Sequence, residues 1–473
     1  MSVRKAPGRP WRRHRPHRPR GGTAPAALSL ALAAVAALLG LEIGACGPRG
    51  ASPGAGAAPR DVILISIDTL RASHLGCYGY GKPTSPHLDR FREDAVLFRQ
   101  AISTAPSTLA AHASMMTSLV SRQHGASFDL HRRLAPSFLT VAGVFRQHGY
   151  RTISFNDGGQ IAAELGIGNG FELYRSSRPT DRYHFADIVD QATGWMAANP
   201  PGRLFLFLHT YEVHHPYTPA RRFLDLMEPP DRPYRGPLPA GETDMATLVA
   251  IKEGRLRAGP RDRAHVVATY DGEVRSMDEA FGRLVAFLRN RGRYDAALIV
   301  FTADHGEEFD EHGTLGWHAH TLYDELLRVP LLVKYPYGEH GGETVASQVR
   351  IIDVAPTLVA ALGWPMPEQF RGADLTPLVL GRAGAPRFAV SRFDSLPTAA
   401  IRAGSWKLIG ERLFDLRSDP GETRDVAAAH PEIVGFLRRR LAALEAERPA
   451  AAGPRVELSA EERDRLRSLG YLP

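Results

Sequence analysis

Long apolar runs alternate with helical patterns from residue 61 onward. The runs DVILISI, RTISFN, RLFLFLHTY and AALIVFTAD begin at residues 61, 151, 203 and 296. Each has the length and the β-branched or aromatic content of a strand buried on both faces. Residues 265–292 instead carry apolar side chains at helical spacing, at Val267, Tyr270, Val274, Met277, Phe281, Leu284 and Leu288. This alternation predicts an α/β fold, with a parallel sheet covered by helices.

The pattern changes from about residue 385. AVSRF, TAAIRAGSWKLIG and ERLFDLRS predict short antiparallel strands, and HPEIVGFLRRRLAALEAE predicts a helix after them. We therefore expect a large α/β domain over residues 61–384 and a smaller C-terminal subdomain over residues 385–473.

The first 60 residues have the composition of an export signal. A basic, proline-rich start precedes an apolar run that ends in IGAC, which resembles a bacterial lipobox with Cys46 as the lipid-modified residue. We expect a leader over 1–45 and a flexible tether over 46–60. An uncleaved membrane anchor and simple secretion are the alternatives. All three place the folded part outside the cytoplasm, and the first two tether it to the membrane, in the periplasm or on the surface of a bacterium.

The net charge of +7 belongs to this leader. Residues 1–45 hold eight of the 58 Lys and Arg residues and one of the 51 Asp and Glu residues, so 50 basic and 50 acidic residues remain. A neutral folded part gives no reason to expect nucleic acid as a partner. Its single cysteine, Cys77, excludes a disulfide framework and a cysteine-based metal site within that part.

Polar side chains follow two of the predicted strands. Asp68 comes after the first, and Asp304 and His305 come after the last. Because the carboxyl ends of parallel strands meet at one edge of a sheet, these side chains are expected to form a site for a divalent ion, of Zn, Mn, Mg or Ca. Thr108, just before a predicted helix, is either a nucleophile that the metal activates or only a helix cap.

Histidines supply further candidates. His214 lies in HTYEVHHPY, and His318 and His320 lie in GWHAHTLYDELLRVP. They can bind substrate oxygens or protonate a leaving group, or they are structural histidines. The acidic run Glu307, Glu308, Asp310 and Glu311 is interpreted as a solvated loop rather than a set of ligands.

These pieces together resemble the sulfatase family of the alkaline phosphatase superfamily. The matching segments run in family order from about residue 60 to 428: VILISIDTLRASHLGCYGY, TAPSTLAAHASMMTS, HTYEVHHPY, YDGEVRSMDEAFGRL, FTADHGEEFDEHG, HTLYDELLRVPLLV, DVAPTLVAALG and WKLIGERLFDLRSDPGET. The resemblance implies a large mixed, mostly parallel sheet flanked by helices, a small C-terminal α+β subdomain, and a metal site. It also implies cleavage of sulfate or phosphate esters through a covalent intermediate.

The chain departs from the family at one motif. Sulfatases carry Cys or Ser in a C/S-x-P/A-x-R signature that is converted to formylglycine, whereas the corresponding positions here are Thr108, Ala110 and His112. Threonine cannot become formylglycine, so none is expected, and phosphate esters are favoured as substrates. The resemblance then gives Thr108, His214 and His320 catalytic roles, His112 and His318 substrate-binding roles, and a sulfated or phosphorylated glycan or lipid as substrate. A phosphoethanolamine or phosphoglycerol transferase and a non-catalytic binding protein are the alternatives.

Overall fold

The computed structural model describes residues 60–177, 183–199, 202–228, 233–382, 387–447, 453–469 and 471. The predicted leader over 1–45 and the tether over 46–60 lie outside the described residues, except for Arg60. In the part of the chain that is described, no helix is both long and apolar enough to span a bilayer.

A nine-stranded mixed sheet forms the centre of the large domain. Its order is β11 (Thr344–Arg350), β2 (Val96–Ile102), β10 (Leu331–Lys334), β6 (Leu298–Ala303), β1 (Asp61–Ile67), β5 (Leu204–Thr210), β3 (Arg151–Asn156) and β4 (Leu173–Ser176), and β9 (Arg328–Val329) pairs with β2. The pairings among β6, β1, β5, β3 and β4 are all parallel, while β10 runs antiparallel to both of its neighbours. The four apolar runs of the sequence are β1, β3, β5 and β6, so the predicted fold class is confirmed.

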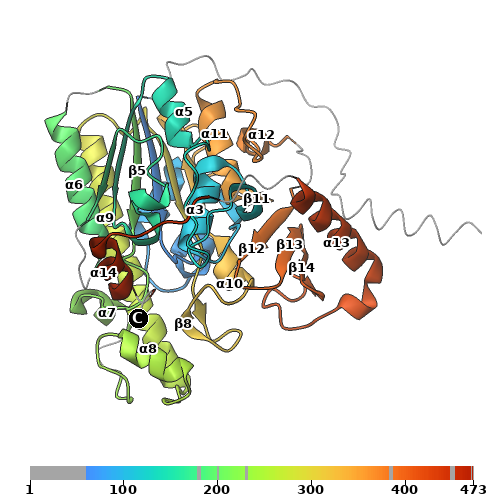
Figure 1. Ribbon diagram of the computed structural model, residues 1–473. Helices are drawn as coiled ribbons and strands as arrows, with labels where there is room; N and C mark the ends of the chain where they lie inside the picture. Colours follow the sequence, from blue (N-terminus) through green and yellow to red (C-terminus); the bar gives the residue numbers. More distant parts are fainter. Residues whose placement is uncertain are drawn as a thin grey trace, which may run out of the picture. The chain divides into compact units, whose positions relative to one another are not determined.

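Helices cover both faces of this sheet (Figure 1). On one side lie α6 (Phe185–Ala198) and α9 (Pro260–Asn290); on the other lie α3 (Thr108–Thr117), α5 (Val141–Gln147) and α11 (Val354–Ala361). The apolar stripe of α9 is buried from Tyr270 to Leu288 as its spacing predicts, but Val267 is only partly buried and Val266 is buried instead. Phe281 packs edge-on against Phe301 of β6 with ring centroids 5.3 Å apart. The remaining shorter elements are α2 (Pro86–Phe91), α4 (Ser121–His124), α7 (Arg221–Met227), α8 (Met245–Lys252), α10 (Asp324–Leu327), α12 (Thr376–Val379), β7 (Glu308–Phe309) and β8 (Leu315–Trp317).

A separate four-stranded antiparallel sheet follows in the chain. It consists of β12 (Ala389–Arg392), β13 (Ala399–Ala403), β14 (Trp406–Ile409) and β15 (Arg412–Asp415). Helix α13 (Pro431–Ala446) packs on it, with Ile433 and Leu437 in one apolar cluster with Ile401. The predicted C-terminal strands and helix are therefore present, while the domain boundaries at residues 384 and 385 stay a prediction.

The last helix, α14 (Ala460–Ser468), lies away from α13 and against the large domain (Figure 1). Glu462 accepts a hydrogen bond of 3.0 Å from the backbone N–H of Gly159. The fully buried Arg465 pairs with Glu462 and donates to the carbonyl of Ser177. This docking carries the end of the chain, with Tyr471, to the carboxyl edge of the large sheet.

Three strands end together at that edge. Ile67, the last residue of β1, lies opposite Thr210 of β5 and Ala303 of β6. The residues that follow these strands therefore share one location, as the strand-end argument predicts.

Candidate functional site

Asp68, Asp304 and His305 converge at the ends of β1 and β6. All three side chains are fully buried. Nε2 of His305 lies 3.8 Å from Oδ1 of Asp68 and 3.5 Å from Oδ2 of Asp304. The Nδ1 atom of His305 is hydrogen-bonded to the carbonyl of Gly306 at 3.0 Å, which directs the other ring nitrogen toward the two carboxylates. The structure thus brings together the three predicted metal ligands.

The polar atoms of this group fit a cation. Oδ1 of Asp68 and Oδ2 of Asp304 are buried and have no hydrogen-bond partner among the described residues. Burial raises the pKa of Asp68 to about 7 and also raises that of Asp304, because a carboxylate removed from water is harder to ionise. Uncompensated carboxylate oxygens that face one imidazole nitrogen are a donor set for a divalent metal ion. The identity of the ion does not follow from this arrangement.

Thr108 is the first residue of α3, and its hydroxyl is aimed at this group. Oγ1 donates to Oδ2 of Asp68 at 3.1 Å and lies 3.4 Å from Nε2 of His305. Ser107, not Thr108, occupies the N-cap position, and its side chain makes no capping hydrogen bond. The hydroxyl of Thr108 therefore lies at the positive end of the helix and next to the candidate metal ligands.

His112 lies behind Thr108 on the same helix. Its ring is fully buried, with Nδ1 bonded to the carbonyl of Thr108 at 2.9 Å and Nε2 to Oγ of Ser66 at 3.0 Å. Burial lowers the pKa of His112 to about 4, so the ring is neutral at neutral pH. Both ring nitrogens are engaged inside the protein, so the structure does not present His112 to a substrate, although a substrate-binding role was predicted for it.

His214 and His318 meet at the hydroxyl of Tyr471. This hydroxyl lies 2.8 Å from Nε2 of His214, 3.2 Å from Nε2 of His318 and 3.3 Å from Oγ1 of Thr108. Burial lowers the pKa of His318 to about 3 and that of His214 well below its usual value. His214 and His318, for which catalytic and substrate-binding roles were predicted, thus both contact the hydroxyl of Tyr471, and this hydroxyl lies next to that of Thr108.

His320 is directed elsewhere. Its Nε2 is hydrogen-bonded to Oε2 of Glu308 at 2.7 Å; burial opposes the charge on the ring, but this carboxylate raises the pKa of His320 above its usual value. His320 therefore binds Glu308 and does not contact the Tyr471 hydroxyl, as His214 and His318 do. Its catalytic role stays a prediction that the geometry does not support.

The interpretation of the acidic run as a solvated loop is wrong for its first two members. Glu307 and Glu308 are fully buried, because Glu307 contacts Tyr217 and His318 while Glu308 accepts from His320 and two backbone N–H groups. In the sequence alone, a run of charged residues looks like a solvent-exposed surface, because the polar partners that allow its burial come from other segments of the chain.

Three further residues at the site escaped the sequence argument. His209 near the end of β5 lies 3.6 Å from Oδ2 of Asp68, and a histidine at the end of the run LFLFLHT was a signal that could have found it. His215 is adjacent to His214 and is equally buried. Tyr471 had no sequence signal, since its position depends on the docking of α14.

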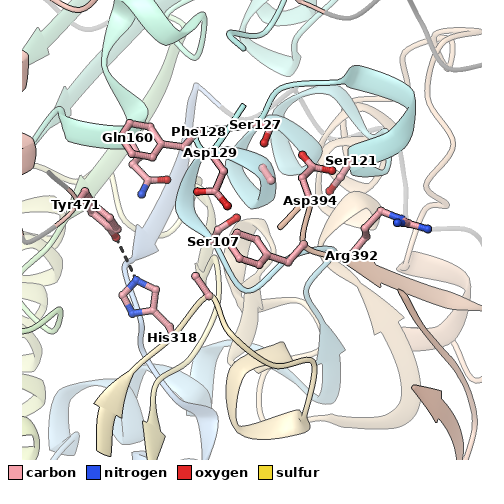
Figure 2. A pocket seen from close by; sticks show the side chains of 13 residues that line it. Ser107, Ser121, Ser127, Phe128, Asp129, Gln160, His318, Arg392, Asp394 and Tyr471 are labelled. Carbon is pink, nitrogen blue, oxygen red and sulfur yellow. Dashed lines mark hydrogen bonds between the residues drawn. The ribbon is translucent and has the colours of Figure 1, made fainter. Parts of the chain in front are cut away.

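A pocket opens beside this centre (Figure 2). Its wall near Thr108 is formed by Ser107, the N-cap of α3, and Ala110 within that helix, with His318 and Tyr471. Farther out it is lined by Ser121, Ser127, Phe128, Asp129, Gln160, Ala319, Arg392, Phe393 and Asp394. Arg392 is paired with Glu445, whereas Asp129 and Asp394 are exposed. The pocket therefore combines aromatic walls with carboxylates at its mouth.

Sequence comparison identifies relatives of this chain. The sequence model of the sulfatase family matches residues 60–364, and one for the C-terminal region of N-sulphoglucosamine sulphohydrolase matches residues 311–447. Arylsulfatase K of Canis lupus familiaris is 23% identical over 487 residues, which cover 88% of each chain. The match to arylsulfatase K of Bos taurus is 29% identical but covers only 35% of this chain and 34% of that protein. An ulvan-active sulfatase of Formosa agariphila is 24% identical over 67% of this chain and 65% of its own length.

Solved structures share the fold. The phosphonate monoester hydrolase of Agrobacterium radiobacter superposes with a TM-score of 0.67 at 20% identity, covering 85% of this chain and all of that one. A protein in complex with its substrate D-glucosamine-2-N,6-O-disulfate superposes with a TM-score of 0.66 at 19% identity, covering 82% of this chain and 97% of that one.

Proposed function

Because the chain belongs to the sulfatase family, we propose that it is an ester hydrolase that cleaves phosphate esters in preference to sulfate esters, through a covalent intermediate on Thr108. One observation carries the proposal. The hydroxyl of Thr108 lies within 3.4 Å of both Asp68 and His305, at the start of a helix and at the carboxyl edge of the sheet.

The choice of phosphate rests on threonine at this position. A threonine has no aldehyde hydrate through which a sulfated intermediate can collapse by elimination. A sulfothreonine would require attack of water at sulfur, whereas a phosphothreonine is released by in-line attack of water at phosphorus. The fold shared with a phosphonate monoester hydrolase supports chemistry at phosphorus on this scaffold.

The residues of the site fit two displacements in sequence. Oγ1 of Thr108 attacks phosphorus and gives its proton to Oδ2 of Asp68, while the bond to the ester alcohol breaks and the alcohol takes a proton from solvent. Water then attacks phosphothreonine and releases a proton to solvent, the bond from phosphorus to Oγ1 breaks, and Oγ1 takes back the proton held by Asp68. The product is phosphate from a monoester and a phosphate monoester from a diester. A divalent ion held by Asp68, Asp304 and His305 would lower the pKa of the Thr108 hydroxyl and offset the charge of the transferred group.

The transferred group would occupy the point where the hydroxyl of Tyr471 now lies. This point is 3.3 Å from Oγ1 of Thr108, too close for the phenol and a phosphoryl group to be present together. Tyr471 therefore has to withdraw when an ester binds. The pocket beyond it (Figure 2) then receives the alcohol, and its aromatic walls and exposed carboxylates suit a hydroxyl-rich sugar or a lipid headgroup.

A panel of three nitrophenyl esters tests the proposal. Nitrophenyl phosphate, a bis(nitrophenyl) phosphodiester and nitrophenyl sulfate share one chromophore and one leaving group, so kcat/KM compares the transferred groups alone. With Zn²⁺, Mn²⁺, Mg²⁺ and Ca²⁺ each supplied in turn, we expect kcat/KM for the better phosphate ester to equal or exceed that for the sulfate. Turnover of sulfate with no turnover of either phosphate ester contradicts the proposal.

The proposal includes the cellular location of the activity. Export and a lipid tether at Cys46 would place the site outside the cytoplasm, facing phosphorylated or sulfated glycans and lipids of the envelope or the surroundings. Ulvan, after which the sulfatase of Formosa agariphila is named, and D-glucosamine-2-N,6-O-disulfate, the substrate bound by one structural neighbour, are a glycan and a sugar, which supports a glycan ester over a small metabolite.

A further inference from the structure

Gln160 lies on a short 3₁₀ turn, Gly159–Ile161, that follows β3. Strand β3 runs parallel to β5, so it ends at the same edge of the sheet as β1 and β6. The side chain of Gln160 is 3% exposed and lines the pocket together with Ser107 and Tyr471 (Figure 2). We propose that the amide of Gln160 donates a hydrogen bond to a charged oxygen of the transferred group and holds that group for attack by Thr108. The inference rests on the proposed function and names a further residue of its site.

One hydrogen bond fixes which end of this amide is free. Oε1 of Gln160 accepts from the backbone N–H of Leu109 at 3.2 Å, and an N–H group can only donate, so the oxygen of the amide lies toward α3. Leu109 directly follows Thr108, so the amide lies close to the proposed nucleophile. Among the described residues, none accepts a hydrogen bond from the amide nitrogen of Gln160. Its two N–H donors are therefore left for a molecule in the pocket.

The turn that carries Gln160 is held by other segments of the chain. Gly158 and Gly159 have φ angles of 71° and 63°, a region that favours glycine. The N–H of Gly159 donates to Glu462 of α14 at 3.0 Å. The N–H of Gln160 itself donates to the hydroxyl of Tyr211 at 2.9 Å. The amide is therefore fixed before a substrate binds, as a donor that stabilises a transition state has to be.

A phosphate or sulfate oxygen carries negative charge and needs hydrogen-bond donors or a cation. Among the described residues that line the pocket, the cationic side chain is Arg392, and Glu445 binds it at 2.7 Å and 3.0 Å. His318 is neutral, because burial lowers its pKa to about 3. Its Nδ1 lies 3.0 Å from the Glu307 carboxylate and carries the hydrogen, so Nε2 offers a lone pair to the pocket. The amide of Gln160 supplies the donors that these two side chains do not.

Gln160→Glu tests the donor. The variant keeps the length of the side chain and an oxygen that accepts from Leu109, but it replaces the two N–H donors by a charged oxygen. Calorimetry on metal-loaded, full-length protein measures the affinity for inorganic phosphate without any turnover, and we expect this affinity to fall at least about tenfold. We expect kcat/KM for nitrophenyl phosphate to fall about 100-fold, the usual effect of losing one donor to a transition state.

Two esters distinguish a donor from a structural residue. The new carboxylate repels the dianionic nitrophenyl phosphate more than the monoanionic bis(nitrophenyl) phosphodiester, so the monoester should lose more of its kcat/KM. Equal losses for the two esters, or an unchanged phosphate affinity in folded Gln160→Glu, overturn the inference. A wild type that hydrolyses neither ester contradicts the proposed function instead, and the phosphate affinities of the two proteins then still decide the role of Gln160.

Gln369→Glu is the matched control. Oε1 of Gln369 accepts from the N–H of Leu139 at 2.9 Å, and Nε2 donates to the carbonyls of Leu139 and Thr117 at 2.7 Å and 3.2 Å. Both ends of this amide are used within the protein, so the same substitution should lower the unfolding temperature and leave phosphate affinity and both kcat/KM values unchanged. If Gln160→Glu does not fold, the neutral Gln160→Met replaces it, and an unchanged phosphate affinity in that variant overturns the inference.

Discussion

At the scale of a residue, the proposed role of Thr108 rests on the contacts of its hydroxyl with Asp68 and His305. Its hydroxyl is directed to Asp68 and His305, so Thr108→Ala should retain the fold and bound metal while kcat falls by at least about three orders of magnitude. If Thr108 only capped the helix, Thr108→Ala would instead cost about 1 kcal/mol of stability and leave kcat nearly unchanged.

Thr117→Ala is the control for Thr108→Ala. Thr117 lies on the same helix, is fully buried, and donates to the carbonyl of Ala113 at 2.6 Å. Removal of its hydroxyl should lower the unfolding temperature without lowering kcat. Measured kcat values and melting curves of the two variants show whether Thr108 acts as a nucleophile or only as a structural residue. Comparable losses of kcat in both variants would refute the assignment of Thr108 as the nucleophile.

In the proposed mechanism the hydroxyl of Tyr471 lies where the transferred group has to bind, so it should compete with the substrate. In Tyr471→Phe the ring stays, but the hydroxyl that contacts Thr108, His214 and His318 is lost. One net hydrogen bond of about 1 kcal/mol corresponds to about a fivefold lower KM for a small phosphate ester, with kcat little changed. Steady-state kinetics measure both constants.

Tyr174→Phe removes the hydroxyl of another half-buried tyrosine, which donates to the carbonyl of Ile161, and should leave KM unchanged. A higher KM in Tyr471→Phe would mean that the phenol helps to bind the ester, contrary to its place in this account.

A residue's place in the site could be predicted where it depends on nearby sequence, and could not where it depends on distant segments of the chain. The convergence of Asp68, Asp304 and His305 could be predicted because they lie within two residues of the ends of β1 and β6, and parallel strands end at one edge. Glu307 was misjudged because its burial depends on Tyr217, His215 and His318, which come from distant segments. Tyr471 could not be found because no local pattern records where the end of a chain docks.

At the scale of the elements, strand β10 carries a charged residue into the interior. Lys334 is 1% exposed, and its ammonium donates to the carbonyls of Asp295, Ala297 and Tyr335. Burial lowers the pKa of Lys334 from 10.5 to about 8. The unfolded chain therefore binds more protons than the folded one between these values, and stability rises as the pH increases from about 8 to 10.5. The full shift corresponds to at most about 3 kcal/mol.

Lys334→Met isolates this contribution, because its side chain does not titrate. Urea unfolding of both proteins at pH 7.5, 9 and 10 should show the wild type gaining stability relative to the variant as the pH rises. Tyrosines that titrate at higher pH act on both proteins alike, so the difference between them reports Lys334. Parallel stability curves would show that Lys334 keeps its ordinary pKa in the folded protein.

The elements themselves were predictable to different degrees. Strands β1, β5 and β6 are long, mainly apolar runs, and α9 has a long periodic stripe, so their patterns are strong. Strand β3, with the sequence RTISFN, is buried on both faces but has Thr152, Ser154 and Asn156 on one of them, so its pattern is weaker. Helix α14 has the sequence AEERDRLRS, which is typical of a solvated helix, yet Arg465 is fully buried in contact with Glu462 and Ser177. A charged pattern cannot predict burial that depends on partners elsewhere in the chain.

At the scale of the whole molecule, we expect the predicted leader to determine where the protein works. Lipidation at Cys46 predicts that the protein sediments with membranes, and that Cys46→Ser either releases it or blocks processing. Cys77→Ser, which changes the one other cysteine, should leave the partition unchanged. The mass of the mature N-terminus distinguishes a cleaved and lipidated protein from one that keeps its leader, and an intact leader contradicts the lipobox.

The covalent intermediate is the central claim, and one measurement tests it most directly. Wild-type protein is mixed with an excess of nitrophenyl phosphate, quenched in acid within the first turnovers, digested and analysed by peptide mass spectrometry. The account predicts one added phosphoryl group on the peptide that contains Thr108, located on that residue by fragmentation, and no such label in Thr108→Ala. Rapid release of nitrophenol with Thr108 unmodified, or with the label on another side chain, would contradict it.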